Sequence, residues 1–521
     1  MASMGSGSAA AEPLEIRRTL TDLYARRQNR PLWSRAGAVT PQARALVGAL
    51  RGCATYGLRP EDYRAEPLAH ELDALLATPS PTAAQWMAFD AGLSEAALRL
   101  LHDLHFGRIE PRAAGFDMPR RTESFDGAMY LEELASHADA SAVLAEVEPG
   151  YLHYRLLRQS LARYRELART PGLTALPALA RRSVLPGEAY AGAPALRKLL
   201  AALGDLPLGQ AARTDPLLDA DLVAALKRFQ YLHGLREDGT LGRGTYAALT
   251  VPLAQRVRQI ELTLERWRWV PVLESPTLIV NIPQFRLFFF RSGVDKEADM
   301  LRMNVIVGRE YPRLHTPVFS SDMNAVIFRP YWEVPPSIAR RELVPLLRRN
   351  PHYLESQHLE IAADGSDTSA PLAPSPSNLD ALEAGTLRLR QRPGPDNALG
   401  LIKFVLPNSY DVYLHSTPAQ RLFDEPRRDF SHGCIRVADP IALAAQVLRG
   451  TPGDWTAEKV RAAMNGDRTF RVKLAQPVHV LILYGTAVAT EDGAVHFLED
   501  IYGYDRRLER LLGLTPVARG F

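Results

Sequence analysis

The amino-acid sequence predicts a multidomain α+β protein in which two helical regions precede a mostly β domain. Its 521 residues correspond to about three domains of ordinary size, and an apolar fraction of 46% is sufficient for packed cores. Apolar residues recur at helical spacing before Pro276, and beyond it their spacing shortens to the period of two that is typical of strands. We therefore expect helical domains first and a sheet second.

Composition and charge exclude several classes of protein. The basic residues (62) barely outnumber the acidic ones (59), which does not indicate a nucleic-acid-binding or polybasic membrane protein. Two cysteines, Cys53 and Cys434, cannot form a disulfide framework or a cysteine-rich zinc site, and no His-Glu-x-x-His motif occurs, so we expect no metal and no cofactor. No apolar run is long enough to span a bilayer. Residues 1–8 read as an added leader, and a removed signal peptide or anchor would leave no trace.

Two helical regions and a connecting helix are expected before residue 276. Residues 9–193 are predicted to form an irregular helical scaffold domain, because alanine, leucine and arginine dominate and apolar residues follow helical spacing. Residues 194–250 are predicted to form a compact three-helix module, in which Asp221 caps a helix and Gly234 follows its end. Residues 251–275 are expected to form a linker helix that returns to the scaffold.

Residues 276–498 are expected to form the mostly β domain. A segment at about 338–396 interrupts its strands with a Pro/Ser/Asp-rich stretch between helical pieces, and we interpret it as an inserted lid. Asp492-Gly493 predicts a hairpin turn near the end of the domain, and residues 499–521 are expected to contribute a C-terminal helix. The strand predictions rest on β-branched and aromatic residues at 277–291, 303–307, 325–328 and 405–414.

The sharpest chemical signal is a cysteine flanked by histidine and glycine, with a second histidine 19 positions upstream of the cysteine. Its two strings are Ser431-His432-Gly433-Cys434-Ile435-Arg436-Val437 and Tyr413-Leu414-His415-Ser416-Thr417-Pro418. Consecutive N–H groups around a nucleophile can stabilise an oxyanion. The reactive form of cysteine is the thiolate, so a histidine is needed to take its proton, and His415 and His432 are the candidates. An isolated cysteine is more often a buried, inert thiol, and we interpret Cys53 in that way.

On these motifs the chain resembles the L,D-transpeptidases with a YkuD-type catalytic domain, specifically their large YcbB-type branch. Residues 194–250 resemble a three-helix peptidoglycan-binding module, through 225–230, 233–235 and 244–249. The resemblance implies a mostly β YkuD-type domain with an inserted lid, preceded by the scaffold and this module. Further similarity to the branch lies at 57–63, 331–335, 394–400 and 500–505.

The resemblance also implies roles for the residues of the motif. Cys434 would be the nucleophile and His415 the general base that activates it. The backbone amides of His432, Gly433 and Cys434 would supply an oxyanion hole, which Tyr413 would line. We interpret the His432 side chain as a structural hydrogen-bonding group rather than as the base.

Other residues have supporting or alternative roles. Ser431 would support the nucleophile loop, and His415 would be oriented either by the Ser416 hydroxyl or by a backbone carbonyl. Arg436 is either a clamp for a substrate carboxylate or half of a structural ion pair. Tyr331 and Trp332 either line the donor groove or belong to the core.

The reaction that the resemblance implies takes place on peptidoglycan in the bacterial periplasm. The cysteine attacks the third residue of a tetrapeptide stem, D-alanine leaves, and a side-chain amine of a second stem resolves the thioester into a 3→3 cross-link. Carbapenems would be covalent inhibitors, other cell-wall synthesis proteins are candidate partners, and an N-terminal segment absent here could anchor the protein to the inner membrane. Two alternatives remain open: an L,D-carboxypeptidase or cross-link endopeptidase using the same pair, and a non-catalytic cell-wall-binding scaffold.

Overall fold

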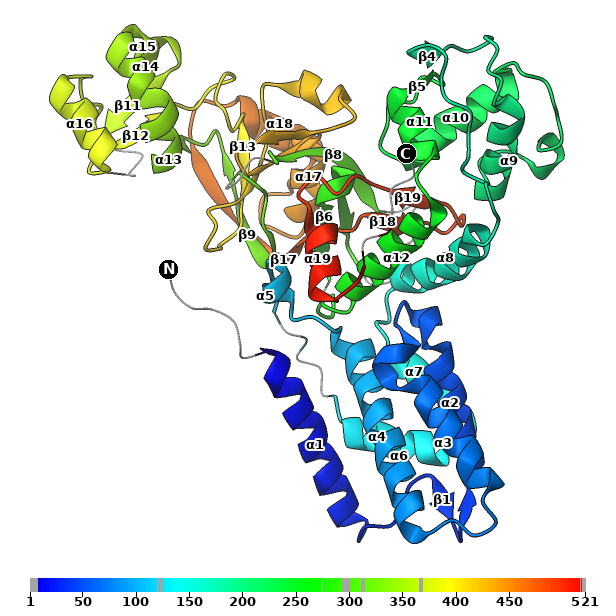
Figure 1. The fold of residues 1–521 in the computed structure, drawn as a ribbon. Helices are drawn as coiled ribbons and strands as arrows, with labels where there is room; N and C mark the ends of the chain where they lie inside the picture. Colours follow the sequence, from blue (N-terminus) through cyan, green and yellow to red (C-terminus); the bar gives the residue numbers. More distant parts are fainter. Residues whose placement is uncertain are drawn as a thin grey trace. The chain divides into compact units, whose positions relative to one another are not determined.

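The computed structural model describes residues 8–119, 121, 125–273, 275–292, 300–310, 314–364, 369–515 and 517. The chain divides into two compact units, of which the first comprises Met1–Val272 and Gly485–Phe521 and the second comprises Leu273–Tyr484 (Figure 1). The first unit is therefore built from both ends of the sequence, with the second unit inserted between them.

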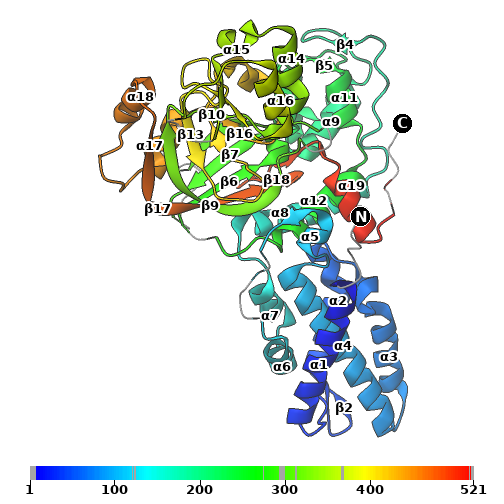
Figure 2. The ribbon, with the colours of Figure 1, turned by 90° about the vertical axis from the view of Figure 1, so that its left-hand side faces the viewer.

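A helical bundle forms the beginning of the first unit, as predicted for the scaffold domain (Figure 2). Thr40 and Thr82 cap two of its helices, each accepting a hydrogen bond from a backbone N–H of the first turn. Apolar residues on the facing sides of the helices form one core, in which Cys53 is fully buried. The helices are α1 (Ser8–Arg26), α2 (Pro41–Gly52), α3 (Ala65–Ala77), α4 (Ala83–Phe106), α6 (Gly127–Ser136) and α7 (Ala140–Val147).

The three-helix module has a core of its own, to which Leu222, Leu226 and Phe229 contribute. Asp219 caps α10 by accepting a hydrogen bond from the Leu222 N–H, so the prediction of Asp221 as the cap was two residues late. Gly234 follows the end of this helix with φ +63°, as predicted. The helices are α9 (Ala193–Leu203), α10 (Ala220–Leu232) and α11 (Arg243–Leu249).

Another core in the first unit lies between two longer helices and a hairpin. Helices α8 (Leu152–Ala168) and α12 (Leu253–Trp267) pack against strands β18 (Ala487–Ala489) and β19 (Val495–Phe497). The sequence predicts these strands within the β domain of 276–498, but their apolar side chains fill the α8–α12 core and place them in the first unit. Beyond the hairpin, the C-terminal helix α19 spans Tyr504–Leu511.

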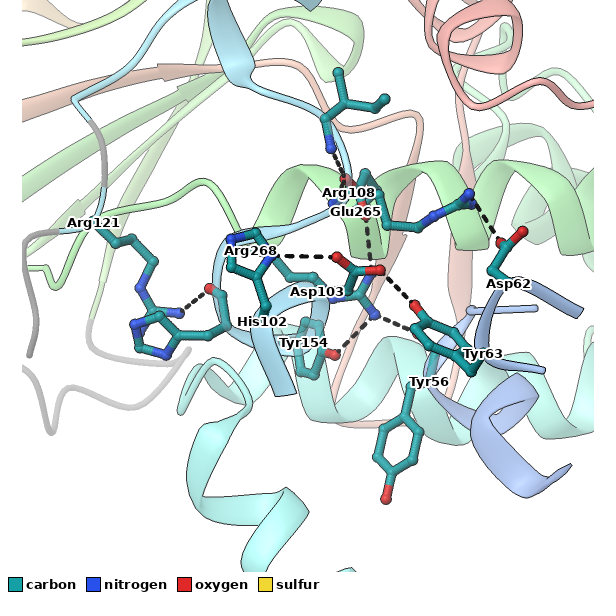
Figure 3. Close-up of polar contacts among 12 residues, drawn as sticks. Tyr56, Asp62, Tyr63, His102, Asp103, Arg108, Arg121, Tyr154, Glu265 and Arg268 are labelled. Atoms are coloured by element: carbon teal, nitrogen blue, oxygen red, sulfur yellow. Dashed lines mark hydrogen bonds and ion pairs between the residues drawn. The ribbon is translucent and has the colours of Figure 1, made fainter. Parts of the chain in front are cut away.

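A buried polar junction ties α12 to the helical bundle (Figure 3). Arg268, just beyond α12, donates to Glu265 at 3.0 Å and to the backbone carbonyl of Tyr56 at 2.5 Å. Glu265 in turn accepts the Ile109 N–H at 3.0 Å. Because these buried charges are paired and hydrogen-bonded, they fix the geometry of the junction. The helix expected at 251–275 is thus held against the scaffold by specific contacts.

The second unit contains a sheet that closes on itself. Its strands follow the order β13-β14-β16-β8-β7-β6-β17-β9, and β13 also pairs with β9. Of the strand expected at 405–414, only the two end residues lie in strands, as the end of β13 and the start of β14. The residues between them form a loop, in which Asn408 hydrogen-bonds to the Leu406 and Val412 carbonyls. The strands are β6 (Thr277–Asn281), β7 (Arg286–Phe290), β8 (Leu301–Gly308), β9 (Val318–Phe328), β13 (Ile402–Val405), β14 (Leu414–His415), β16 (Ile435–Val437) and β17 (Phe470–Leu483). The neighbouring segments are β15 (Asp429–Ser431), α17 (Pro440–Val447) and α18 (Ala457–Asn465).

The insertion is a small folded layer with its own apolar core. It begins at Trp332, earlier than the expected residue 338, because β10 pairs with β12. Residues 367 and 368 of its Pro/Ser/Asp-rich stretch lie outside the described residues. Its elements are β10 (Trp332–Glu333), α13 (Pro336–Ile338), the π-helical turn η5 (Ala339–Leu343), α14 (Val344–Arg349), α15 (His352–Ser356), β11 (Leu359–Ala362), α16 (Pro376–Ala384) and β12 (Arg388–Gln391).

Candidate active site

Three neighbouring strands bring the predicted catalytic residues onto one face of the sheet. Lys403 in β13 lies opposite His415 in β14, which in turn lies opposite Arg436 in β16. The same register places Tyr413 beside Cys434, at the residues just before β14 and β16. Because residues paired across strands project to the same side, these five side chains share one face.

The opposite face of the same strands is apolar and closed to solvent. Ile402, Phe404, Leu414, Ile435 and Val437 alternate with the polar residues and are each fully buried. Strand alternation therefore separates a core face from a chemical face. The core face anchors the strands and so fixes the positions of the nucleophile and the imidazole.

The Cys434 sulfur occupies a half-buried, polar position. Its thiol donates to the Asp411 carbonyl at 3.7 Å. Burial raises the pKa of the Cys434 thiol, whereas hydrogen bonds from the Tyr413 backbone N–H and phenol, and the charges of Lys403 and Arg436, lower it. The surroundings thus offset part of the cost of forming a thiolate.

His415 is the buried imidazole of this face. Its Nδ1 lies 2.5 Å from the Ser416 carbonyl oxygen, so Nδ1 carries the proton and Nε2 is the acceptor nitrogen. Burial and the neighbouring cations Arg436 and Lys403 lower the pKa of His415 to about 3. The ring is therefore neutral at physiological pH and able to accept a proton. Within the described residues it makes no hydrogen bond to the Cys434 sulfur, which lies diagonally across the sheet.

The Ser416 hydroxyl has a separate structural role. Its Oγ accepts the Leu401 N–H at 2.8 Å and donates to the Leu399 carbonyl at 3.1 Å. Of the two groups expected to orient His415, a hydroxyl or a backbone carbonyl, the structure uses a carbonyl, that of Ser416. The hydroxyl instead attaches the end of β14 to the segment that leads into β13.

Two buried hydroxyls brace the nucleophile loop. Ser431 Oγ donates to the Cys434 carbonyl at 2.6 Å and accepts the Gly433 N–H at 3.1 Å. Thr316 Oγ1 donates to the Gly433 carbonyl at 2.7 Å. Gly433 has φ +121°, a conformation that side chains with a Cβ rarely adopt. Among the amides expected to form the oxyanion hole, that of Gly433 is thus already engaged by Ser431.

The predicted residue His432 contacts the insertion. Its Nε2 lies 3.0 Å from Oε1 of Glu342, which belongs to the π-helical turn η5. Such turns are frequent at functional sites. The contact joins the insertion directly to the nucleophile loop, and sequence reasoning did not identify Glu342.

The cations Arg436 and Lys403 border the sulfur. Arg436 forms no ion pair within the described part of the chain, and its Nε is buried without a hydrogen-bond partner. This favours the interpretation of Arg436 as a clamp for an external anion over a structural ion pair. Lys403, which sequence reasoning also missed, places Nζ 3.8 Å from the centroid of the Tyr413 ring.

Tyr331 and Trp332 lie at the base of the insertion. The Arg390 guanidinium stacks 4.7 Å from the centroid of the Tyr331 ring, and Trp332 packs against the core of the insertion. Their contacts therefore support the alternative in which they stabilise the insertion.

The part of the chain that the structure describes contains neither a candidate metal site nor a helix that could span a membrane. No group of three or more His, Cys, Asp or Glu side chains there could hold a metal ion. The helices there are also too short or too polar to cross a membrane.

Comparisons with known protein families match three segments of the chain. Residues 275–458 match the YkuD family, described as the L,D-transpeptidase catalytic domain, and this segment includes Cys434 and His415. Residues 18–161 match a scaffold domain. Residues 192–249 match a family described as "Putative peptidoglycan binding domain". The predicted fold class is thus confirmed.

A bacterial relative supports the same class of protein. The chain is 29% identical over 284 residues to a protein of Haemophilus influenzae (strain ATCC 51907 / DSM 11121 / KW20 / Rd) named "Putative L,D-transpeptidase". The alignment covers 53% of this chain and 55% of the relative, so the chain spans about half of the relative's length. Two segments of the chain thus match an L,D-transpeptidase catalytic domain and a family described as a putative peptidoglycan binding domain, a combination that indicates an extracytoplasmic location.

Proposed function

We propose that this protein is a peptidoglycan L,D-transpeptidase of the YcbB-type branch that forms 3→3 cross-links in the bacterial periplasm. The observation that carries the proposal is a cysteine and a neutral, buried imidazole on one face of adjacent strands, within the matched segment. A thiol beside an imidazole that can take its proton is the arrangement required for acyl transfer.

In the first half of the reaction, Cys434 acylates itself with a donor stem. The sulfur attacks the carbonyl carbon of the third residue, a diamino acid, while Nε2 of His415 takes the thiol proton. The bond between that carbon and the nitrogen of the terminal D-alanine breaks, and the imidazolium returns the proton to the leaving amine. A thioester remains on Cys434, and Arg436 would hold a carboxylate of the stem by a charge-assisted contact.

In the second half, the side-chain amine of an acceptor stem attacks the thioester carbon. His415 takes a proton from the attacking nitrogen, the carbon–sulfur bond breaks, and Cys434 regains its proton. One amide has replaced another, so the cycle needs no oxidant or external energy source. The insertion would act as a lid that excludes water from the thioester and favours the amine.

The test compares the wild type with Cys434→Ala on purified tetrapeptide muropeptides, with products resolved by mass. We expect dimers and free D-alanine from the wild type, neither from Cys434→Ala, and both from the control Cys53→Ala, because Cys53 is buried in the helical bundle. We also expect a carbapenem to add its mass to Cys434 in the intact protein.

Other products would support the alternatives. Tripeptides without dimers would indicate a carboxypeptidase, and cleavage of added dimers would indicate an endopeptidase. Absence of both turnover and carbapenem labelling would indicate a non-catalytic cell-wall-binding scaffold.

A further inference from the structure

Lys403 is a half-buried cation beside the nucleophile. Strand β13 places the Lys403 Cα opposite that of His415. Its neighbours in the strand, Ile402 and Phe404, are fully buried on the opposite face of the sheet. The ammonium lies over the face of the Tyr413 ring, with Nζ 3.8 Å from the ring centroid. At this distance a cation is attracted by the ring and restrains its position.

Tyr413 connects this lysine to the Cys434 sulfur. Its backbone N–H and its phenol both hydrogen-bond toward the sulfur and favour the thiolate. The Lys403 ammonium therefore contacts Tyr413, and Tyr413 in turn contacts the Cys434 sulfur. Its charge also reaches the sulfur through space, since Lys403 is a source of stabilisation for the Cys434 anion.

Charged groups of both signs surround Lys403. Burial lowers the pKa of Lys403, and negative charge on Cys434, Glu333 and Asp411 raises it. The other charged or titratable groups that face this region are Arg471 on β17, His415 on β14 and Arg436 on β16.

We propose that Lys403 is a positioning residue that holds Tyr413 against Cys434 and supplies the positive charge under which the sulfur ionises. This inference deepens the proposed function, because it assigns a residue to the activation of the same nucleophile. Lys403 transfers no proton in this scheme. It favours the anion that forms when the thiol proton moves to His415, and it does so before any substrate is bound.

The experiment follows alkylation of Cys434 by iodoacetamide as a function of pH, in the full chain carrying Cys53→Ala. The midpoint of this profile reports the ionisation of Cys434 without substrate. We expect Lys403→Met to move the midpoint upward by about one pH unit, the effect of losing a nearby opposite charge. Lys403→Arg keeps the cation, so its midpoint is expected to stay close to that of the wild type. Lys473→Met removes an exposed cation from β17 and is expected to leave the midpoint unchanged.

An unchanged midpoint in Lys403→Met would overturn the proposal, as would an equal shift in Lys473→Met. If Lys403→Met does not fold, Lys403→Gln repeats the test with a polar side chain. Alkylation requires no peptidoglycan, so the two proposals can fail separately. If Lys403→Met shifts the midpoint but the wild type forms no cross-links, the proposed function alone is contradicted. If the wild type forms cross-links but Lys403→Met leaves the midpoint unchanged, the role of Lys403 alone is contradicted.

Discussion

The proton affinity of His415 is determined by what surrounds its ring. The side chain is 4% exposed, its Nδ1–H is held by the Ser416 carbonyl, and Arg436 and Lys403 lie opposite it across the sheet. Burial and both cations disfavour the imidazolium, so the free site holds a neutral base. The same surroundings make the folded state of the second unit sensitive to acid.

We expect the second unit to lose stability as the pH falls from about 6.5 toward 3, in part because of His415. The pKa of His415 is lowered from 6.5 to about 3 on folding, so between these values the unfolded chain binds a proton that the folded chain does not. Protonation therefore favours unfolding. Urea unfolding at pH 7 and pH 5 gives the difference in the free energy of unfolding between the two pH values. His415→Gln is expected to reduce this difference. His432→Gln, which replaces a half-exposed histidine of the same unit, is the control. An equal pH dependence in wild type and His415→Gln would contradict this assignment.

The sequence allowed Cys434 and His415 to be predicted as nucleophile and base, because a cysteine flanked by histidine and glycine is not a residue pattern expected from packing alone. It did not predict Lys403, because a charged residue between two apolar residues in a strand ordinarily indicates a solvent-facing position. Only the register of β13 against β14 places Lys403 on the chemical face. The contact between Glu342 and His432 depends on how the insertion folds back, and local sequence contains no signal for it.

The insertion has its own apolar core and contacts the nucleophile loop. Strand β12 pairs with both β10 and β11, and helices α14 and α16 contribute to the core beside this small sheet. The π-helical turn η5 carries Glu342 to His432, two residues before Cys434. Such a contact can couple the position of the insertion to the water content around the thioester.

We expect Glu342→Gln to increase the share of tripeptide over dimer in the proposed reaction, because it removes the charge that holds the insertion to His432. An exposed pair of this kind contributes about 1 kcal/mol at most, so the change in the product ratio should be up to about fivefold. Product mass spectrometry measures it, and Glu355→Gln, on the exposed surface of α15, is the matched control. An unchanged ratio would show that this contact does not influence the choice of acceptor.

The type of an element, helix or strand, was predictable where the apolar residues kept one period over a long segment. The predicted boundaries of domains were wrong where pairing between segments far apart in sequence determines them. Trp332 joins the insertion through a strand pairing with β12, more than fifty residues later in the sequence. The β18–β19 hairpin follows the β domain in sequence, yet its apolar face matches α8 and α12. Neither partner choice is encoded in the local pattern of apolar and polar residues.

At the scale of the whole molecule, each unit contains one cysteine. Cys53 is fully buried in the first unit and begins the 53–56 turn, in which the carbonyls of Ala54 and Thr55 accept hydrogen bonds from arginines of α8. Burial raises the pKa of Cys53 to about 12, so this thiol reacts only when its surroundings open. Cys434 is half-buried and reacts in the folded protein, so unfolding of the second unit changes its alkylation rate rather than first exposing the thiol. The two thiols can therefore monitor the unfolding of the two units in one experiment.

We expect Phe497→Ala to destabilise the first unit by about 3–5 kcal/mol, as for other buried aromatic truncations. Phe497 is 3% exposed and packs edge-on against Tyr164 of α8, with ring centroids 4.9 Å apart. Alkylation of Cys53 in increasing urea should therefore begin at a lower concentration, while the Cys434 profile stays in place. Leu208→Ala, at a position 78% exposed in the same unit, is the control that should change neither profile. If the Cys434 profile moves together with that of Cys53, the two units unfold as one cooperative system. The structural division into two units would then not correspond to two independent unfolding transitions.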